Sequence, residues 1–213
     1  VLNKTLLTSK TIAMEYSPNC ELPRVSRVDA GTIELVRQSG VDVVSSADLF
    51  QYSTQVWSGN DLKSHERASK LLTKIVHEAF SYIGENINAD ITEFKVAEFI
   101  RSRFVEENMV ITDGPVVATN AHSSDPHYEP DRENCSVIQK SDWVLIDLWS
   151  SLSGEGNMAA DITWTGYVGD SIPPKNQAVF DIVIGARDCA LDYLKNAHQK
   201  GRFVKGYEMD KIA

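Results

Sequence analysis

The segment from residue 141 to residue 169, SDWVLIDLWSSLSGEGNMAADITWTGYVG, constrains the fold of this chain more than any other. Two runs with the composition of β-strands flank a loop rich in Ser and Gly, SSLSGEGN, and this arrangement predicts a β-hairpin. With the hairpin centred on Gly154, Asp147 lies directly opposite Asp161. The sequence therefore predicts two carboxylates that face each other across neighbouring strands.

Two like charges in directly opposed positions destabilise a sheet, because their Cβ atoms lie about 4.5 to 5.5 Å apart. The apolar neighbours of Asp147 and Asp161 indicate that the pair is also buried, where ionised carboxylates are costly unless they bind a cation or share a proton. A divalent metal ion with oxygen ligands is the simplest resolution, and a proton-sharing acid/base dyad is the other chemical option. The spacing alone also leaves open an ordinary surface hairpin or a register shifted by one residue.

The rest of the chain indicates an α+β fold in two regions. Residues 10–16 read as a short strand, a helix follows between the capping residue Asp29 and the terminating Gly40, and residues 41–46 form a β-branched strand. Such a strand-helix-strand unit has parallel strands. We assign residues 1–57 to the closing part of a small α/β domain.

Residues 58–213 form the second predicted region, with two amphipathic helices, a β segment and a third long helix. The apolar side of the first helix consists of Leu71, Leu72, Ile75, Val76, Ala79, Phe80 and Ile83. The second helix begins at about Thr92, with Phe94, Val96, Ala97, Ile100 and Phe104 on its apolar side. The third begins at Pro173-Pro174 and ends at Gly201, and the residues expected to face inward are Val179, Ile182, Val183, Ala186, Ala190, Tyr193, Leu194 and Ala197.

Composition excludes several classes of protein. A formal net charge of -9 without a basic patch argues against nucleic-acid binding. The apolar runs are far shorter than the roughly 20 residues of a membrane span, and the first residues lack the pattern of a signal peptide. The three cysteines, Cys20, Cys135 and Cys189, are widely spaced and form no CxxC motif, so neither a disulfide framework nor a thiolate zinc site is expected. A cytoplasmic location is the default expectation.

Two histidines lie in the segment TNAHSSDPHYEP, residues 119–130, where the prolines predict a loop. Their spacing of five residues suits neither one face of a helix nor one face of a strand. Taken alone, His122 and His127 have the ordinary solvated or structural interpretation, since most loop histidines carry no chemistry.

The segment DLWSSLSGEGNMAADITWTGYVG resembles the aspartate hairpin of the pita-bread metallopeptidases, the superfamily of methionine aminopeptidase, Xaa-Pro aminopeptidase, prolidase and creatinase. The usual form is a strand ending Ile-Asp-Leu-Gly, a turn, and then Asp-Ile-Thr-Arg-Thr. The resemblance implies that Asp147 and Asp161 ligate two divalent metal ions, of Mn, Co or Zn. The chain departs from the pattern in a slightly longer loop, in Trp149 in place of the glycine, and in Trp164 in place of the arginine.

The same resemblance extends over nearly the whole chain. His127-Tyr128 is similar to the His-Tyr dipeptide whose imidazole contacts substrate and stabilises the tetrahedral intermediate, so a catalytic role is implied for His127 but not for His122. Residues 10–49 resemble the last part of a creatinase-type N-terminal domain, and residues 203–213 resemble the segment before the metal-binding histidine motif. Residues 58–213 then correspond to the N-terminal half of a pita-bread catalytic domain.

The resemblance implies metal-assisted removal of an N-terminal residue that precedes proline, or cleavage of Xaa-Pro dipeptides. The resemblance also implies a peptide substrate with proline near its N-terminus, and homodimers are common in similar families. Because the superfamily completes its site with a histidine and two glutamates C-terminal to the end of this sequence, we expect the 213-residue chain to be a fragment that is catalytically incomplete by itself. The alternatives are an amidinohydrolase of the creatinase type that uses no metal pair, and a binding or scaffold protein that has lost hydrolysis.

Overall fold

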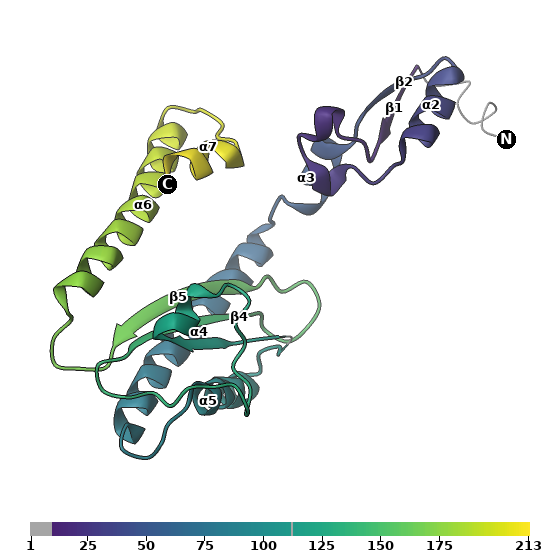
Figure 1. Ribbon diagram of the computed structural model, residues 1–213. Helices are drawn as coiled ribbons and strands as arrows, with labels where there is room; N and C mark the ends of the chain where they lie inside the picture. Colours follow the sequence, from purple (N-terminus) through teal and green to yellow (C-terminus); the bar gives the residue numbers. More distant parts are fainter. Residues whose placement is uncertain (1–9, 112) are drawn as a thin grey trace. The chain divides into compact units, whose positions relative to one another are not determined.

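The computed structural model describes residues 10–111 and 113–213. The chain divides into two compact units, one that ends at Lys63 and one that begins at Ser64. The elements of both units are labelled in Figure 1. The assignment of residues 1–57 to a creatinase-type domain and of residues 58–213 to half of a catalytic domain stays a prediction.

In the first unit, strands β1 (Thr11–Met14) and β2 (Asp42–Ser45) pair in parallel and helix α2 (Ala30–Gln38) connects them. The Asp29 carboxylate caps α2 by accepting a hydrogen bond from the Thr32 backbone N–H at 2.9 Å, and Gly40 follows the helix with a φ of +80°. The short helices η1 (Pro18–Cys20) and η2 (Pro23–Val25) precede α2, and helix α3 (Ala47–Thr54) follows β2. The predicted strand-helix-strand unit is confirmed.

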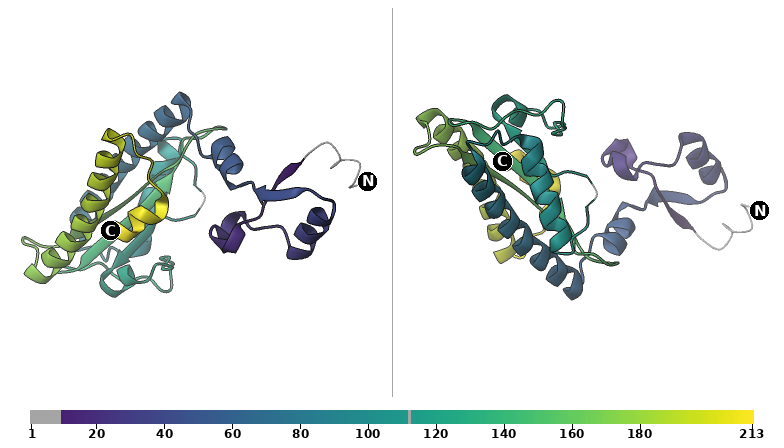
Figure 2. Two further views of the ribbon diagram at one scale, coloured as in Figure 1. Left: turned by 90° about the horizontal axis from the view of Figure 1, so that it is seen from above. Right: turned by 90° about the horizontal axis from the view of Figure 1, so that it is seen from below.

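The second unit is built on an antiparallel sheet with helices on one face. Its strands are β3 (Val116–Thr119), β4 (Trp143–Ser150) and β5 (Ala160–Tyr167), with β4 in the middle. Helices α4 (Gly59–Asn86) and α5 (Glu93–Glu106) lie against the sheet, as the views in Figure 2 show. Every second residue of β4, beginning with Val144, is buried in the core between the sheet and these helices. The opposite face of β4 is half-buried.

The predicted apolar stripes of α4 and α5 form this core. Leu72, Ile75, Val76, Ala79 and Ile83 of α4 are buried, with Leu71 and Phe80 packed against them. On α5 the buried apolar residues are Val96, Ala97, Ile100 and Phe104, and the Thr92 side chain caps the helix. The 3.6-residue period therefore identified both helices and most of their inner faces, although Phe94 of α5 is only half-buried and does not belong to this core.

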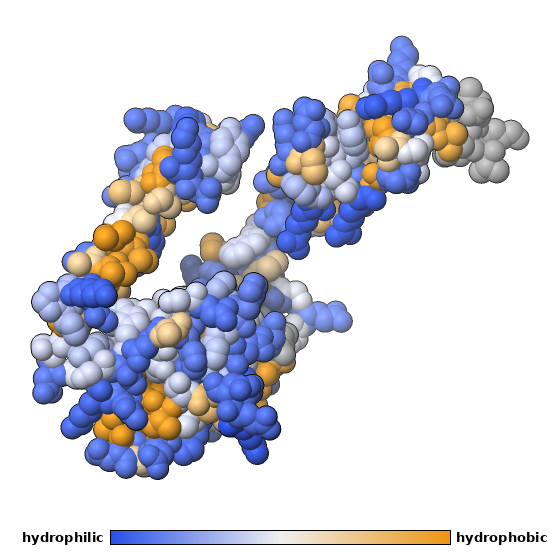
Figure 3. Space-filling model, viewed as in Figure 1, coloured by the Kyte–Doolittle hydropathy of each residue, from blue (hydrophilic) through white to orange (hydrophobic). Residues whose placement is uncertain are grey.

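The third long helix, α6 (Pro174–Gln199), forms as expected, but its apolar side is exposed. Ile182 is 72% exposed and Val183 60%, and among the residues expected to face inward only Ala197 is buried. Figure 3 shows hydrophobic surface along α6. The inward orientation was wrong for this chain, because helix α7 (Gly206–Ile212) packs only near the end of α6. In the described part of the chain, no helix is long and apolar enough to cross a membrane.

Candidate active site

The β4–β5 hairpin forms, but with a register different from the one predicted. Asp147 pairs with Thr163, and Asp161 pairs with Trp149, so the two aspartates are offset by two positions instead of directly opposed. The midpoint of the pairs is Glu155, one residue beyond the expected centre. In the connecting loop, the Asn157 side-chain amide donates to backbone carbonyls of residues 152 to 154.

The offset of two nevertheless keeps both carboxylates on one face of the sheet, since side chains alternate with a period of two. Diagonal neighbours of this kind are about 7 to 8 Å apart, within reach of mutual electrostatic influence. Partial burial, and after it the negative charge of Asp147, raises the pKa of Asp161 above its ordinary value. The Thr163 hydroxyl donates a hydrogen bond of 2.7 Å to the Asp147 carboxylate.

The expectation that the two aspartates are buried was wrong. They lie on the sheet face opposite α4 and α5, where Asp147 is half-buried and Asp161 is exposed. The apolar residues that suggested burial, such as Ile146 and Leu148, alternate with Asp147 and point to the other face, into the helical core. Period-two alternation explains the difference, because apolar neighbours in a strand bury the opposite face.

Two carboxylates on one face provide hard oxygen donors of the kind that divalent cations bind. A stable site for such an ion needs further ligands. In residues 10–111 and 113–213, no group of three or more His, Cys, Asp or Glu side chains is placed to hold a metal ion. Asp147 and Asp161 are therefore suited to supply part of the ligands of a metal site.

Trp149, which stands where the resembled motif has glycine, shares the face of the two aspartates. Its indole N–H donates to the Asp113 carboxylate at 3.2 Å, and its ring covers Gly114 so closely that a Cβ atom there would lie 2.6 Å from the ring. Trp149 is also the cross-strand neighbour of Asp161. A large aromatic side chain thus lies beside the carboxylate pair.

Trp164, the replacement for the arginine of the motif, lies on the other face of the sheet. It pairs with the core residue Ile146, and its ring meets the His77 ring of α4 edge-on, with centroids 4.8 Å apart. The two tryptophans therefore differ in position, and only Trp149 is on the face that carries Asp147 and Asp161.

His127 lies in the loop after the short helix η3 (Asn120–Ser124) and is exposed. Its backbone N–H donates to the Asp125 carboxylate at 2.9 Å. Within the described residues, no hydrogen bond joins its imidazole to Asp147 or Asp161. The catalytic role of His127 and the metal-binding role of the aspartates stay predictions.

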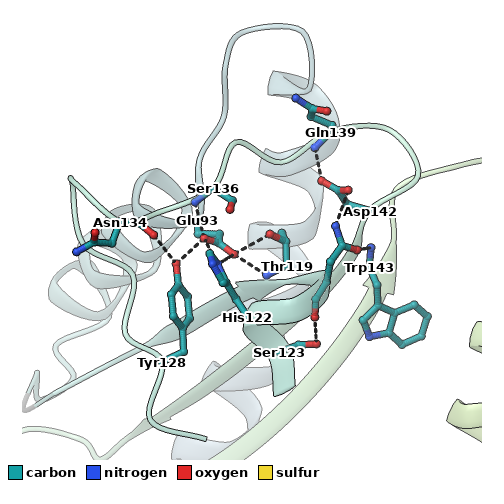
Figure 4. A network of polar contacts seen from close by, with 11 residues as sticks. Glu93, Thr119, His122, Ser123, Tyr128, Asn134, Ser136, Gln139, Asp142 and Trp143 are labelled. Atoms are coloured by element: carbon teal, nitrogen blue, oxygen red, sulfur yellow. Dashed lines mark hydrogen bonds and ion pairs between the residues drawn. The ribbon is translucent and has the colours of Figure 1, made fainter. Parts of the chain in front are cut away.

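Glu93, which the sequence did not single out, is the centre of a buried polar network beside this loop (Figure 4). Its side chain is fully buried, and it accepts hydrogen bonds from the Tyr128 hydroxyl (2.5 Å), from the Thr119 backbone N–H (2.6 Å) and hydroxyl (2.7 Å), and from the Ser136 backbone N–H (2.7 Å). The His122 Nδ1 atom lies 3.0 and 3.1 Å from its two oxygens.

These contacts explain the charge state of the network. Burial by itself would raise the pKa of Glu93, but the hydrogen bonds from Tyr128, Ser136 and Thr119 lower it below its ordinary value overall. Burial, and then the neighbouring Glu93, raises the pKa of Tyr128. The carboxylate is thus ionised at neutral pH, and the phenol donates to it.

A signal for Glu93 exists in the sequence. Glu93 continues the apolar stripe of α5 one turn toward the N-terminus, since it precedes Val96, Ala97 and Ile100 by three, four and seven residues. An acidic residue on the buried side of a helix requires compensating partners. The ordinary structural interpretation of His122 agrees with its place in this network, where its ring also stacks on Tyr128 with centroids 4.2 Å apart.

Comparison with known proteins places most of the chain in one family. The model of metallopeptidase family M24 matches residues 66–212. Among curated proteins, no match is found.

Solved structures with a similar fold are known. A prolidase from Thermococcus sibiricus is 19% identical, with a TM-score of 0.57, over 77% of this chain and 43% of that one. An X-Pro aminopeptidase from Thermotoga maritima MSB8 is 23% identical, with a TM-score of 0.53, over 90% and 50%. A dipeptidase from Mycobacterium ulcerans is 20% identical, with a TM-score of 0.57, over 84% and 43%. The chain therefore spans half or less of the length of these proteins.

Proposed function

Because the chain belongs to metallopeptidase family M24, we propose that the polypeptide containing it is a metal-dependent aminopeptidase or dipeptidase that acts on Xaa-Pro peptide bonds. Family membership and the similar solved structures confirm the expected α+β fold class and the resemblance to the pita-bread superfamily. The Xaa-Pro preference is supported by the names of two neighbours, a prolidase and an X-Pro aminopeptidase.

The observation that carries the proposal is the placement of Asp147 and Asp161 on one face of the hairpin. Without a cation, partial burial and then the charge of Asp147 raise the pKa of Asp161 and so disfavour its ionisation. A divalent ion reverses the sign of that interaction, because each carboxylate then faces a positive charge. The hairpin thereby favours metal binding over a bare pair of acids.

Each residue has a distinct role in the proposed site. Asp147 and Asp161 bind the metal ions, and Thr163 orients Asp147 through its hydroxyl hydrogen bond. When bound, the paired ions supply Lewis acidity and an activated water molecule. His127 donates a hydrogen bond to the oxygen of the scissile carbonyl as negative charge develops on it. The metal identity, Mn, Co or Zn, is left to the assay.

The remaining parts of the proposal concern setting and partners. We propose a cytoplasmic location, which is the default expectation for a chain whose three cysteines are widely spaced and form no CxxC motif. The proposed partner is a peptide with proline near its N-terminus, and a homodimer is the proposed assembly. The proposal that 213 residues are incomplete for catalysis rests on the need for ligands beyond two carboxylates.

The test uses the longest natural polypeptide that contains this sequence. Metal is removed by chelation, Mn²⁺, Co²⁺ or Zn²⁺ is added back, and hydrolysis of an Xaa-Pro peptide is compared with that of the matching Xaa-Ala peptide. Asp161→Asn is expected to abolish metal-dependent turnover and to leave thermal unfolding cooperative. Asp170→Asn, a change of the same charge at an exposed residue beyond β5, is the control and is expected to keep full activity.

The same assay separates the alternatives. Full activity of Asp161→Asn would remove that residue from the site. Turnover of a guanidino substrate such as creatine, unaffected by chelation, would favour the amidinohydrolase. A longer polypeptide that folds and binds metal or peptide but hydrolyses neither substrate would favour the scaffold, for which the bulky Trp149 beside the carboxylates is the supporting observation. Assay of the 213-residue chain beside the longer one tests whether it is incomplete.

A further inference from the structure

We infer that Tyr128 is a positioning residue for His127, and that the buried Glu93 carboxylate is the anchor through which Tyr128 acts. The inference rests on the proposed function, because it gives His127 a catalytic role. It adds a specific hydrogen bond between Glu93 of helix α5 and Tyr128, which directly follows the proposed catalytic histidine.

The Glu93 carboxylate is the anchor. Glu93 is fully buried at the start of α5, a helix whose next turns pack into the core of the second unit. Both carboxylate oxygens are used, one by Thr119 at the end of β3 and the other by Tyr128 and Ser136, and His122 contacts both. Charge-assisted hydrogen bonds of this kind are shorter and stronger than neutral ones, so the anchor is rigid.

The Glu93 carboxylate holds the loop between residues 119 and 136. Thr119 and Ser136 mark the two ends of the loop that carries His127, and Tyr128 lies inside it. The loop is therefore attached to one carboxylate through Thr119 at its start, Tyr128 within it and Ser136 at its end, as Figure 4 shows. A loop held at three points loses much of the conformational freedom that an exposed segment otherwise has.

A hydrogen-bonded turn sets the local direction of the backbone at His127. Its backbone N–H donates to the Asp125 side chain, and the Tyr128 N–H donates to the Asp125 carbonyl at 3.1 Å, which closes a turn. Tyr128 is half-buried with its hydroxyl on Glu93, whereas His127 is exposed. With the Tyr128 side chain held on Glu93, the backbone at His127 is held in this turn, and the His127 side chain is exposed beside it.

His122 is a further titratable side chain in this network. His122 stacks on the Tyr128 ring and contacts Glu93, so it supports the phenol from the side. A catalytic donor must be held close to its productive geometry, and a misplacement of about 1 Å can cost roughly a hundredfold in rate. Loss of the hydrogen bond between the Tyr128 hydroxyl and the Glu93 carboxylate is therefore expected to change kcat more than KM.

The experiment is a double-mutant cycle on the longest natural polypeptide that contains this chain, assayed on an Xaa-Pro peptide with the activating metal. Tyr128→Phe keeps the ring and its stacking but removes the hydroxyl. It is expected to lower kcat about tenfold and to change KM less than about twofold. In a His127→Ala background, the same change is expected to alter kcat less than about twofold, because the histidine it positions is gone.

Tyr193→Phe is the matched control. The Tyr193 hydroxyl also donates to a carboxylate, that of Glu208, at 3.0 Å, but it joins α6 to α7 far along the chain from the loop. Its removal is expected to leave kcat unchanged in both backgrounds. Thermal unfolding of each variant checks the fold, and kcat is compared at a temperature below the lowest thermal midpoint of the set, so that unfolding does not contribute to the measured losses.

The outcomes separate the inference from the proposed function. Equal losses of kcat for Tyr128→Phe with and without His127 would mean that the tyrosine acts independently, and would overturn the inference alone. Unchanged kcat in Tyr128→Phe, with His127→Ala inactive, would also overturn the inference and leave the function in place. Full activity of His127→Ala would remove both the catalytic role of His127 and the inference that depends on it.

Discussion

Asp147 and Asp161 lie on the same face of the β4–β5 hairpin, offset by two positions in its register. Because the offset is even, the side chains stay on one side of the sheet, and an odd offset would have separated them. Partial burial and the charge of Asp147 raise the pKa of Asp161. The protein without metal therefore carries an unfavourable interaction at the proposed site.

Replacing Asp161 with Asn is expected to stabilise the metal-free protein at pH 7, because the substitution removes one of two like charges on neighbouring strands. The thermal midpoint is expected to rise by about 2 °C. In the longest natural polypeptide that contains this chain, Mn²⁺ is expected to raise the thermal midpoint of the unsubstituted protein and not that of the variant, since a ligand stabilises the state that binds it. Circular dichroism melting checks both effects. A lower midpoint for the metal-free variant contradicts the prediction, and Asp170→Asn serves as its control.

Replacing Glu93 with Gln is expected to reduce the free energy of unfolding by about 3 kcal/mol at pH 7, because buried donors lose a charged acceptor. The pKa of Glu93 in the folded chain is below the ordinary 4.5. Its contribution is therefore fully present above the pKa of the unfolded chain and is lost as the pH falls through the folded value.

Urea unfolding measured between pH 7 and pH 3 tests this dependence. The difference in unfolding free energy between the parent and Glu93→Gln is expected to shrink below about pH 4.5. Glu155→Gln, at an exposed loop position, is expected to show almost no difference at any pH. If the difference in unfolding free energy between the parent and Glu93→Gln grows toward acid pH, the prediction is wrong.

Replacing Gly114 with Ala is expected to cost about 3 kcal/mol of unfolding free energy. The new Cβ atom would lie 2.6 Å from the Trp149 ring, and the backbone φ of +69° disfavours any side chain. In a Trp149→Ala background only the backbone penalty remains, and the same substitution is expected to cost about 1 to 2 kcal/mol. Gly84→Ala, where no atom lies within 4 Å, is the control and is expected to be neutral or stabilising. Equal costs in both backgrounds would show that the ring does not press on Gly114.

Replacing Ile182 with Lys on α6 is expected to change the unfolding free energy of the 213-residue chain by less than about 0.5 kcal/mol, because the residue is 72% exposed. Leu72→Ala on α4, at a fully buried position, is expected to cost about 3 kcal/mol. Chemical denaturation of the two variants compares these positions. A loss for Ile182→Lys as large as that for Leu72→Ala would mean that the outer face of α6 is packed in solution.

The sequence identified most of the elements, because their signals are local. The periods of the apolar residues identified α4 and α5 together with their buried faces, and the Asp29 cap and Gly40 marked the ends of α2. For α6 the same period identified the helix, but the expected burial of Ile182 was wrong, since an apolar stripe predicts a packing face without supplying its partner.

By itself, then, the sequence determined the longer helices, the parallel strand pair, the hairpin and the residue types that could bind metal, because neighbouring residues encode periodicity, capping and turns. Tertiary structure alone decided the register that opposes Asp161 to Trp149 and the burial of Glu93 among partners 26 to 43 residues away. Register depends on the length and conformation of the connecting loop, and a buried acid depends on which distant donors reach it. Both are set by contacts between segments that lie far apart along the chain.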